Sequence, residues 1–430
     1  MNYKSVFALA SLSLAAITLG SCLGSSDNST SYADIAAVTS FSIDTVMLDS
    51  VDQEKTFTID QINKKIFNID SLSYGSEDSI KNILMNVSTT GYLGHNDLLI
   101  SLSDSVDLSE TMTTPYVLQV VSPTNNKHLI AYDVEVRVHQ QKTDSLHWNL
   151  ITSDFSNAKL TAPLQAAWLN GTMHVYDTAG NYFTTEDGKV WNERTATWPT
   201  APNYISIRSF ANTLWAVGTD GSLMTSVDGL TWVKQTTSNT LINLITVLDN
   251  KMLALVENNS GQTVWGTIES DYTITLGDVV DGKFPLTHLN GFEYYTANDD
   301  ARALCIGATS SEDNNTDAWF TANGLHWSAL HSSLTSAQLP NVGSRPYIFK
   351  QGDQFYTLPT DLAAIYESPE SLTWQQATDL VLVPTEMAHT AGAAMAIDAE
   401  QRIWIIAPAS GNSPEQVWNG RVNKLGFVNQ

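Results

Sequence analysis

The sequence predicts an all-β protein with two unlike units, an Ig-like β-sandwich over residues 36–142 followed by a β-propeller over residues 143–430. Three observations carry this prediction. Period-two hydrophobic runs, which turn one face of a strand inward and the other outward, fill the first unit. A turn that ends in tryptophan recurs through the second unit. Asn-Gly and Asp-Gly pairs, which favour tight hairpins, separate its short apolar runs.

The N-terminus has the features of an exported bacterial lipoprotein. Lys4 precedes an uncharged, mostly apolar run over residues 5–19, which has signal-peptide length and is shorter than the ~20 apolar residues of a membrane span. The run ends in Leu19-Gly20-Ser21-Cys22, and this end resembles a lipobox, in which the cysteine thiol accepts diacylglycerol. We expect a signal peptide over residues 1–21 and lipidation of Cys22; the alternative is an ordinary signal peptide with a chance cysteine.

Residues 22–35 combine the lipidated cysteine with a small, polar segment, which predicts a flexible tether. No later segment is long and apolar enough to span a bilayer, so the lipid would be the only contact with the membrane. We expect an outer membrane lipoprotein of the cell envelope. Asp27, soon after the cysteine, is compatible with display on the cell surface.

The composition narrows the range of partners. A net charge of −24 repels nucleic acid and anionic membranes, so we expect no nucleic-acid partner. With Cys22 lipidated, Cys305 has no cysteine left for a disulfide, and its apolar neighbours predict a buried core residue. We expect the protein to be a monomer.

The first unit should contain about seven short strands, a number typical of an Ig-like sandwich of ~105 residues. Turn-rich segments such as Ser73–Ser76 and Ser122–Asn126 separate the strands. The last strand would be Asp133–His139. The clearest runs are Thr39–Ile43, Thr56–Asp60, Lys65–Ile69, Asp97–Leu102, Tyr116–Val121 and Tyr132–Val138.

The second unit repeats a turn that closes on tryptophan. The four clear copies are Thr184–Trp191, Thr225–Trp232, Phe320–Trp327 and Glu367–Trp374, and Ser145–Trp148 looks like a partial copy. The tryptophans at 148, 191, 232, 327 and 374 are 43, 41, 95 and 47 residues apart. The longest gap fits two repeats, with a degenerate copy near Ser270–Ile274. A period of about 40–50 residues is typical of propeller blades.

Each repeat should supply four strands. In residues 164–197 they would be Leu164–Leu169, Met173–Asp177, Tyr182–Thr185 and Val190–Arg194, joined at Asn170-Gly171, Ala179-Gly180 and Asp187-Gly188. The repeats predict six blades, which end at Trp191, Trp232, about Ile274, Trp327, Trp374 and about Phe427. Seven blades remain an alternative if the strand at Trp148 belongs to a blade of its own.

Turns of the form Ser/Thr-x-Asp-Gly-x-Thr-Trp resemble the Asp-box of neuraminidase-type (BNR) repeats, in a form one residue shorter. Phe57–Asp60, Asn68–Gly75, Val136–Gln140 and Asp144–Trp148 further resemble an uncharacterised family of Bacteroides-type lipoproteins, in which an Ig-like N-terminal domain precedes a propeller. The resemblance covers nearly all of the mature chain. It implies this architecture, and no biochemical role comes with it.

Asp-box residues usually stabilise their own turns, because the aspartate caps the turn and the tryptophan packs between blades. Trp215 and Trp404 lie in mid-strand and should be core residues rather than platforms for sugar stacking. We predict the structural turn role for Asp187, Gly188, Trp191, Asp228, Gly229, Trp232, Asn323, Gly324, Trp327 and Trp374.

No catalytic constellation stands out from the sequence. A sialidase needs an arginine cluster and an Arg-Ile-Pro motif in the first blade, whereas Arg345-Pro346 lies in the predicted fifth blade. The nine histidines lack the spacing of metal ligands, and neither a phosphate-binding loop nor a nucleophile elbow is present. We expect no catalytic residue, no metal and no cofactor.

An Asp-Ser or Asp-Thr pair followed by an aliphatic or small residue occurs seven times, six of them before Trp148. The pattern resembles the O-glycosylation sequon of Bacteroides-type exported proteins. The alternative is ordinary turn chemistry, since Asp-Ser favours turns. The acceptors would be Thr45, Ser50, Ser71, Ser79, Ser105, Ser145 and Thr178.

The sequence therefore favours a non-enzymatic binding or adhesion module that presents a propeller face to a glycan or a surface protein. The first alternative is an Asp-box glycoside hydrolase or lyase acting on polysaccharide, which would need carboxylates ~5–10 Å apart in the propeller mouth. The second alternative is a structural component of the envelope.

Overall fold

The computed structural model describes residues 36–48, 51–123, 129–155, 160–309, 317–331, 338–343, 345–377, 380–387, 391–409 and 413–423. Cys22, Ser50, Phe427 and the predicted signal peptide and tether lie outside these ranges. Within them the chain is all-β, and no helix capable of crossing a membrane is found there. The chain divides into two compact units between Val138 and His139.

The first unit is built around a six-stranded sheet with the order β4-β5-β10-β9-β7-β8, accompanied by the pairs β1-β6 and β2-β3. Neighbouring strands of the large sheet are antiparallel except β5 and β10, which run parallel with Asp133 opposite Lys65. The strands are β1 (Val38–Ile43), β2 (Val46–Leu48), β3 (Val51–Gln53), β4 (Phe57–Asp60), β5 (Lys65–Asn68), β6 (Met85–Thr89), β7 (Tyr92–His95), β8 (Leu98–Leu99), β9 (Tyr116–Val121) and β10 (Leu129–Glu135).

One hydrophobic core joins the large sheet to the β1-β6 pair. Ile66 of β5, Leu118 of β9 and Val134 of β10 belong to the same buried cluster as Val38 and Phe41 of β1. In β9 and β10 the buried residues alternate with more exposed ones, as a sheet with one covered face requires.

The last strand of this unit differs from its prediction. It was expected over Asp133–His139 but begins at Leu129 and ends at Glu135. Beyond Glu135 the backbone N–H of Val136 donates to Thr111 Oγ1 at 2.9 Å instead of to a neighbouring strand. Tertiary hydrogen bonds therefore end a strand that the alternating pattern would continue. The predicted run Asp97–Leu102 likewise shortens to the two residues of β8.

The second unit contains, in its described residues, six four-stranded sheets. Five use consecutive strands. Sheet 1 is β12 (Leu164–Leu169), β13 (Thr172–Asp177), β14 (Tyr182–Thr185) and β15 (Asn192–Arg194); sheet 2 is β16 (Pro202–Phe210), β17 (Thr213–Gly218), β18 (Leu223–Ser226) and β19 (Val233–Lys234); sheet 3 is β20 (Thr240–Leu248), β21 (Lys251–Glu257), β22 (Thr263–Ile268) and β23 (Ile274–Val279); sheet 4 is β24 (His288–Tyr295), β25 (Ala301–Ala308), β26 (Ala318–Thr321) and β27 (Ser328–Leu330); sheet 5 is β28 (Tyr347–Gln351), β29 (Gln354–Leu358), β30 (Tyr366–Ser368) and β31 (Gln375–Gln376).

Sheet 6 combines the two ends of the unit. Its strands are β32 (Ala394–Ile397), β33 (Ile403–Ala407), β34 (Gln416–Asn423) and, beside β34, β11 (Ser145–Ser153). β11 and β34 pair antiparallel with Ser145 opposite Asn423. Trp148 therefore belongs to sheet 6 and not to a sheet of its own. Ser145–Trp148, expected as a partial copy of the turn, is strand because its backbone pairs with β34.

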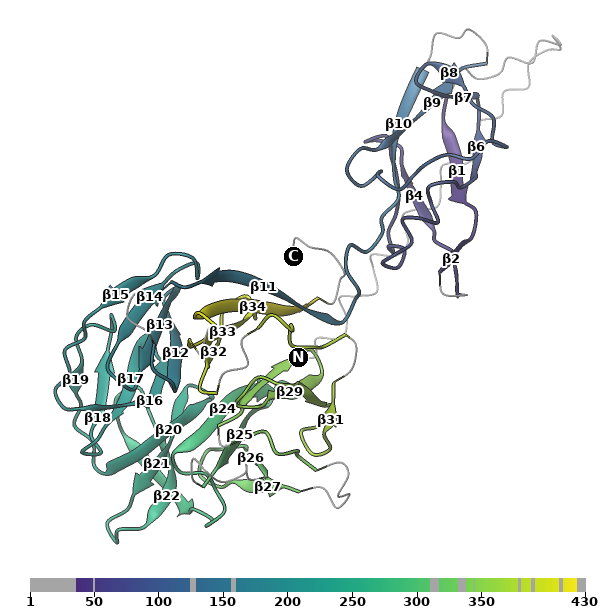
Figure 1. The fold of residues 1–430 in the computed structure, drawn as a ribbon. Helices are drawn as coiled ribbons and strands as arrows, with labels where there is room; N and C mark the ends of the chain where they lie inside the picture. Colours follow the sequence, from purple (N-terminus) through teal and green to yellow (C-terminus); the bar gives the residue numbers. More distant parts are fainter. Residues whose placement is uncertain are drawn as a thin grey trace, which may run out of the picture. The chain divides into compact units, whose positions relative to one another are not determined.

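The sheets surround a common centre, with β15 and β19 on the outside (Figure 1). The first strands of successive sheets contact one another from β12 through β28, and β32 contacts β12. Hydrophobic clusters lie between neighbouring sheets: one joins sheets 5 and 6, and another joins sheets 6 and 1. The sheets therefore form a closed ring held together by apolar packing between every pair of neighbours.

Candidate functional site

In sheets 1 to 5 a turn joins the third strand to the fourth, and four of these turns carry the predicted Asp-box residues. In sheet 1, Asp187 Oδ1 accepts hydrogen bonds from the backbone N–H groups of Lys189 at 2.8 Å and Val190 at 3.0 Å. Asp228 Oδ1 accepts the corresponding two bonds in sheet 2 at 2.8 and 2.9 Å. The carboxylates thus serve N–H groups that have no strand partner in the turn.

A hydroxyl two residues before the carboxylate supports the same turn. Thr185 Oγ1 accepts a bond from Gly188 N–H at 2.8 Å, and Ser226 Oγ accepts one from Gly229 N–H at 2.9 Å. Sheet 4 carries Asn323 at the aspartate position, and its Oδ1 accepts from the N–H groups two and three residues later at 3.0 and 3.1 Å. An uncharged oxygen therefore makes the same bonds as the two carboxylates.

The tryptophans that end the turns pack into the clusters between sheets. In three turns the indole N–H donates to the carbonyl at the glycine position, at 2.8 Å for Trp191, 3.1 Å for Trp232 and 3.2 Å for Trp374. Trp232 is buried and stacks on Trp198 with ring centroids 4.1 Å apart. Trp327 is also buried, but its Nε1 meets no acceptor among the residues the structure describes.

The glycine of each turn lies against the preceding sheet. Gly229 and Gly324 have φ of 74° and 76°, in the left-handed region that favours glycine. A Cβ on Gly229 would lie 2.4 Å from Tyr182 Oη in sheet 1, and one on Gly324 would lie 2.3 Å from Leu253 Cδ2 in sheet 3. In sheet 5 this position holds Ser371, with φ of 62°.

The degenerate copy in sheet 3 keeps the turn and loses the tryptophan. Asp271 Oδ1 accepts a hydrogen bond from Thr273 N–H at 3.0 Å. Tyr272, with φ of 72°, packs on Trp215 with ring centroids 5.4 Å apart. Trp215 and Trp404 are both buried in clusters between sheets.

A cleft of about 510 Å³ lies beside the turns of sheets 1 and 2. Asp187 and Asp228 line it, and so does the buried His174, whose Nδ1 is hydrogen-bonded to Tyr182 Oη at 2.7 Å. Burial lowers the pKa of His174 to about 4, although the charge of Asp228 acts in the other direction. The imidazole is therefore neutral at pH 7. Across the described ranges, no group of three or more His, Cys, Asp or Glu side chains is arranged to hold a metal ion.

Polar side chains near the ring axis link successive sheets. Each donates to a backbone carbonyl of the next sheet or of the segment that leads into it. The donor and acceptor pairs are Gln165 with Ile207 (3.0 Å), Arg208 with Ile245 (3.0 Å), Asn243 with Leu286 (2.9 Å) and Asn290 with Pro346 (2.8 Å). Arg345 returns to sheet 1, where its Nη1 donates to Leu164 O at 3.1 Å.

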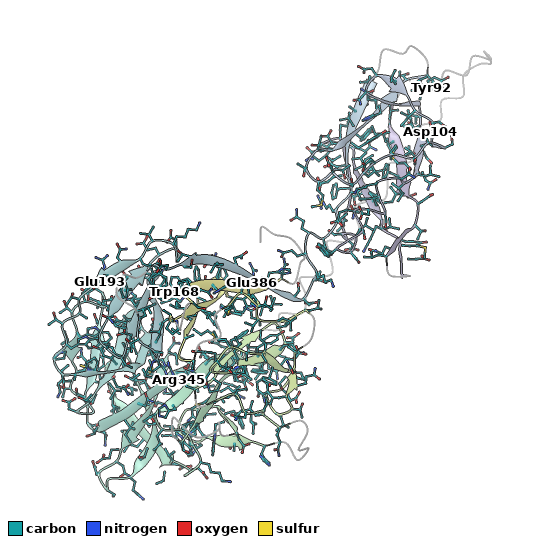
Figure 2. All side chains as sticks on the ribbon, in the orientation of Figure 1. Tyr92, Asp104, Trp168, Glu193, Arg345 and Glu386 are labelled. Carbon is teal, nitrogen blue, oxygen red and sulfur yellow. The ribbon has the colours of Figure 1, made fainter. Side chains whose placement is uncertain are left out.

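Two of these side chains, Arg208 of β16 and Arg345 just before β28, are connected through Gln165. Arg345 Nη2 donates to Gln165 Oε1. Gln165 Nε2 donates in turn to Ile207 O, which also accepts from Arg208 Nη1 at 2.9 Å. Figure 2 shows Arg345 near the centre of the ring. The Gln165 amide and the Ile207 carbonyl together thus link the two guanidinium groups at the axis.

Burial, and then the positive charge of Arg345, lower the pKa of Arg208 to about 9. Burial also lowers the pKa of Arg345. Guanidinium groups keep their proton even in buried positions. Both side chains therefore carry a positive charge at neutral pH.

Carboxylates are nearly absent from the six inner strands. On β12, β16, β20, β24, β28 and β32, all of them within the described ranges, Glu293 is the only carboxylate. Its Oε1 accepts a hydrogen bond from Asp249 N–H at 2.7 Å. The paired carboxylates that glycoside hydrolysis requires do not occur on these strands.

The predicted glycosylation acceptors fall into two groups. Thr45, Ser79, Ser105 and Thr178 are exposed. Ser71 and Ser145 are buried, and Ser145 Oγ donates to Lys142 O. Buried hydroxyl groups are poor acceptors once the chain has folded, and Ser50 lies outside the described residues.

Sequence reasoning missed the axial cluster. Gln165 carried no motif, and Arg345 was weighed only against a sialidase motif. One signal was available: Arg208 follows Ile205-Ser206-Ile207 in a strand of an otherwise apolar ring, and a charged residue inside a buried strand marks a place where the fold needs or tolerates that charge.

Solved structures match this chain only at low similarity. A crystal structure of a DUF4623 family protein from Bacteroides eggerthii has 10% sequence identity and a TM-score of 0.40, covering 90% of this chain and 98% of its own. An alpha-L-arabinanase of Penicillium chrysogenum complexed with arabinobiose has 15% identity and a TM-score of 0.38, covering 65% of this chain and 99% of its own. A streptogramin B lyase has 12% identity and a TM-score of 0.38, covering 65% and 98%.

Family models match both units of the chain. The model described as the DUF6242 beta propeller domain matches residues 142–430, and the model of the DUF6242 N-terminal domain, a domain of unknown function, matches residues 25–136. No curated protein matches the chain. The prediction of an all-β chain with a C-terminal β-propeller domain is confirmed. The chain belongs to the DUF6242 family and carries both the N-terminal domain and the β-propeller domain of that family.

Proposed function

We propose that this protein is an exported, lipid-anchored envelope protein whose propeller is a non-enzymatic binding module for a glycan or a surface protein. The observation that carries the proposal is the convergence of Gln165, Arg208 and Arg345 at the ring axis. Polar groups fixed by hydrogen bonds in a sheltered place are typical of recognition sites. The turn carboxylates Asp187 and Asp228, in contrast, bond to their own turns.

In this proposal the six four-stranded sheets are six blades, and β11 completes the last one. The first unit is an Ig-like sandwich that acts as a spacer or as a second contact. Residues 1–21 are a signal peptide, Cys22 carries the lipid, and residues 23–35 are the tether to the outer membrane. The exposed Thr45, Ser79, Ser105 and Thr178 are the acceptors that O-glycosylation would reach first.

A glycan array probed with the purified protein tests the binding function. We expect binding to a restricted set of glycans, without release of reducing sugar when the same glycans are incubated with the protein in solution. Sugar release would favour the hydrolase alternative. No binding on the array, together with no surface protein recovered in a pull-down, would overturn the proposal.

Fractionation of cells tests the anchor. Wild-type protein should sediment with membranes and incorporate labelled fatty acid, whereas Cys22→Ala should do neither. A Cys22→Ala protein that stays with the membrane fraction would sink the lipid-anchor part of the proposal while leaving the binding function open to its own test.

A further inference from the structure

The ring axis concentrates positive charge in an acidic protein. The chain has a net charge of −24, yet Arg208 and Arg345 are linked at the axis through the Gln165 amide and the Ile207 carbonyl. Arg345 retains only 8% of its exposure. Moving a guanidinium charge out of water is unfavourable unless a partner compensates the charge.

No acidic partner compensates these charges within the described chain. The ion pairs found there involve Arg137, Arg302 and Arg402 among the arginines, and neither Arg208 nor Arg345 takes part in one. The protein partners of the two guanidinium groups are carbonyl oxygens and the Gln165 amide. These dipoles solvate the charges without neutralising them, so the axis keeps a net positive charge.

Both side chains also keep N–H groups that donate to nothing in the described residues. Arg208 uses Nε and Nη1, so both N–H groups of Nη2 are left over. Arg345 uses Nη1 and Nη2, and its Nε is a buried donor with no acceptor. A buried donor without an acceptor destabilises the folded chain. These N–H groups therefore lack an acceptor within the described residues.

Solvent can reach this place. Arg208 is held between sheets 2 and 3, because its Nε donates to Ile245 O and its Nη1 donates to carbonyls of its own strand. Its surface exposure is nevertheless intermediate, unlike that of Ile207 beside it, which is fully buried. A side chain held between two sheets and still partly exposed borders a space open to solvent.

We infer that Arg208 and Arg345 together form the receptor for one oxyanion group of an acidic glycan, either a carboxylate or a sulfate, at the axis of the propeller. Such a group accepts several charge-assisted hydrogen bonds and supplies the missing negative charge. This inference rests on the proposed function of the ring as a binding module and names the class of ligand.

Isothermal titration calorimetry on the purified full chain at constant ionic strength tests the inference with three sugars. D-glucuronate carries a carboxylate, glucose 6-sulfate carries a sulfate, and methyl glucoside is neutral. We expect one or both charged sugars to bind and methyl glucoside not to bind, and the stronger of the two charged sugars identifies the oxyanion. Binding of all three with equal affinity would overturn the inference.

Arg208→Gln and Arg345→Gln should each weaken binding of the charged sugar at least tenfold. Arg194→Gln is the matched control, because Arg194 lies in the outer strand β15 with an exposed side chain, and it should leave the affinity unchanged. Unchanged affinity in both axial variants, with melting temperatures that show folded protein, would overturn the inference.

If the glutamine variants fail to fold, the melting temperature of the wild-type protein tests the inference instead. Sulfate or glucuronate should then raise its melting temperature more than chloride of equal ionic strength, and no such difference would overturn the inference. The two proposals fail differently. The protein could bind glycans on the array regardless of their charge, and equally well after substitution of Arg208 or Arg345. That result would support the binding function and contradict the oxyanion receptor.

Discussion

At the outer turns of the second unit, Asp187 and Asp228 each accept two backbone hydrogen bonds from residues two and three positions later. At the ring axis, Arg208 donates to a carbonyl of sheet 3 as well as to two carbonyls of its own strand, and Arg345 donates to sheet 1. Both arginines keep N–H groups that donate to nothing in the described residues. The bonds of the outer carboxylates are all local, whereas each axial arginine has a partner in another sheet and is incompletely satisfied.

This difference separates two uses of a polar side chain. A satisfied group contributes mainly to stability, because its loss leaves turn N–H groups without partners. An incompletely satisfied charge costs stability and is retained where a ligand completes it. Changes at the turns should therefore lower the free energy of unfolding and spare ligand binding, whereas changes at the axis should weaken ligand binding. Substitutions in the second unit away from the axis, together with changes of pH, test this contrast.

Trp232→Ala should have the largest effect. The substitution removes a buried ring that stacks on Trp198 and donates to Gly229 O. We expect the free energy of unfolding to fall by about 3–5 kcal/mol, measured by urea denaturation. Trp191→Ala is the matched control with a smaller expected loss, because Trp191 is only half-buried. A loss below about 1 kcal/mol for Trp232→Ala would contradict the packing role of the turn tryptophans.

Acid should destabilise the second unit through His174. Burial lowers its pKa to about 4 in the folded chain, against about 6.5 in the unfolded chain. As the pH falls, the unfolded chain therefore takes up the proton before the folded chain does. The contribution of neutral His174 to the free energy of unfolding is fully present above pH 6.5 and is lost as the pH drops towards 4. The difference between the two pKa values corresponds to a loss of about 3 kcal/mol in the free energy of unfolding.

Urea unfolding between pH 4 and pH 8 measures this effect. His174→Gln should have a flatter profile than the wild-type protein over that range. His326→Gln is the control at an exposed histidine, which pairs with Asp278, and its profile should stay steeper than that of His174→Gln. Equal slopes for His174→Gln and the wild-type protein would show that the histidine does not couple folding to pH.

The contrast between turns and axis also explains what could be predicted from the sequence. A turn is local, so the motif formed by Asp187, Gly188 and Trp191 predicts it from a few neighbouring residues. The repetition of this motif predicted the ring of strands. The sheet 6 pairing was less visible. Ser145–Trp148 resembles the turn motif, and only its pairing with β34, more than 250 residues away, makes it strand.

The axial cluster depends on contacts of that long-range kind. Gln165 and Arg345 are 180 residues apart, and no local sequence pattern around either residue predicts their contact. The first unit shows the same limit on a smaller scale, because Thr111 ends a strand whose alternation runs on past Glu135. Contacts between residues close in the sequence can be predicted from one sequence, whereas contacts between residues that only the fold brings together cannot.

Asp228→Ala should cost about 1 kcal/mol at pH 7, because two turn N–H groups lose their acceptor. Burial raises the pKa of Asp228, but hydrogen bonds from Thr231 and Leu230 N–H outweigh it and lower the pKa below the ordinary value of 3.8. The carboxylate therefore contributes stability above pH 4 that is lost as the pH falls below it. Asp228→Asn should keep the turn, as Asn323 does in sheet 4.

Denaturation at pH 7 and at pH 3 distinguishes these variants. Asp228→Asn should lose less stability than the wild-type protein on going to pH 3, and Asp228→Ala should be weaker than Asp228→Asn at pH 7. Both should bind the charged sugar as the wild-type protein does. A tenfold loss of affinity in either variant would break the separation between turns and axis.

Ser371→Gly should have the smallest effect, and it should be a gain. Ser371 has φ of 62° at the position where Gly229 and Gly324 stand in other sheets, and a side chain in this region costs energy that glycine avoids. We expect the free energy of unfolding to rise by up to about 1 kcal/mol, offset in part by the greater freedom of glycine in the unfolded chain. Ser371→Ala, which keeps the Cβ and removes the hydroxyl, is the matched control and should bring no gain. If alanine stabilises the protein as much as glycine, the hydroxyl and not the backbone is the source of the strain, and the four turns would not share one conformational requirement.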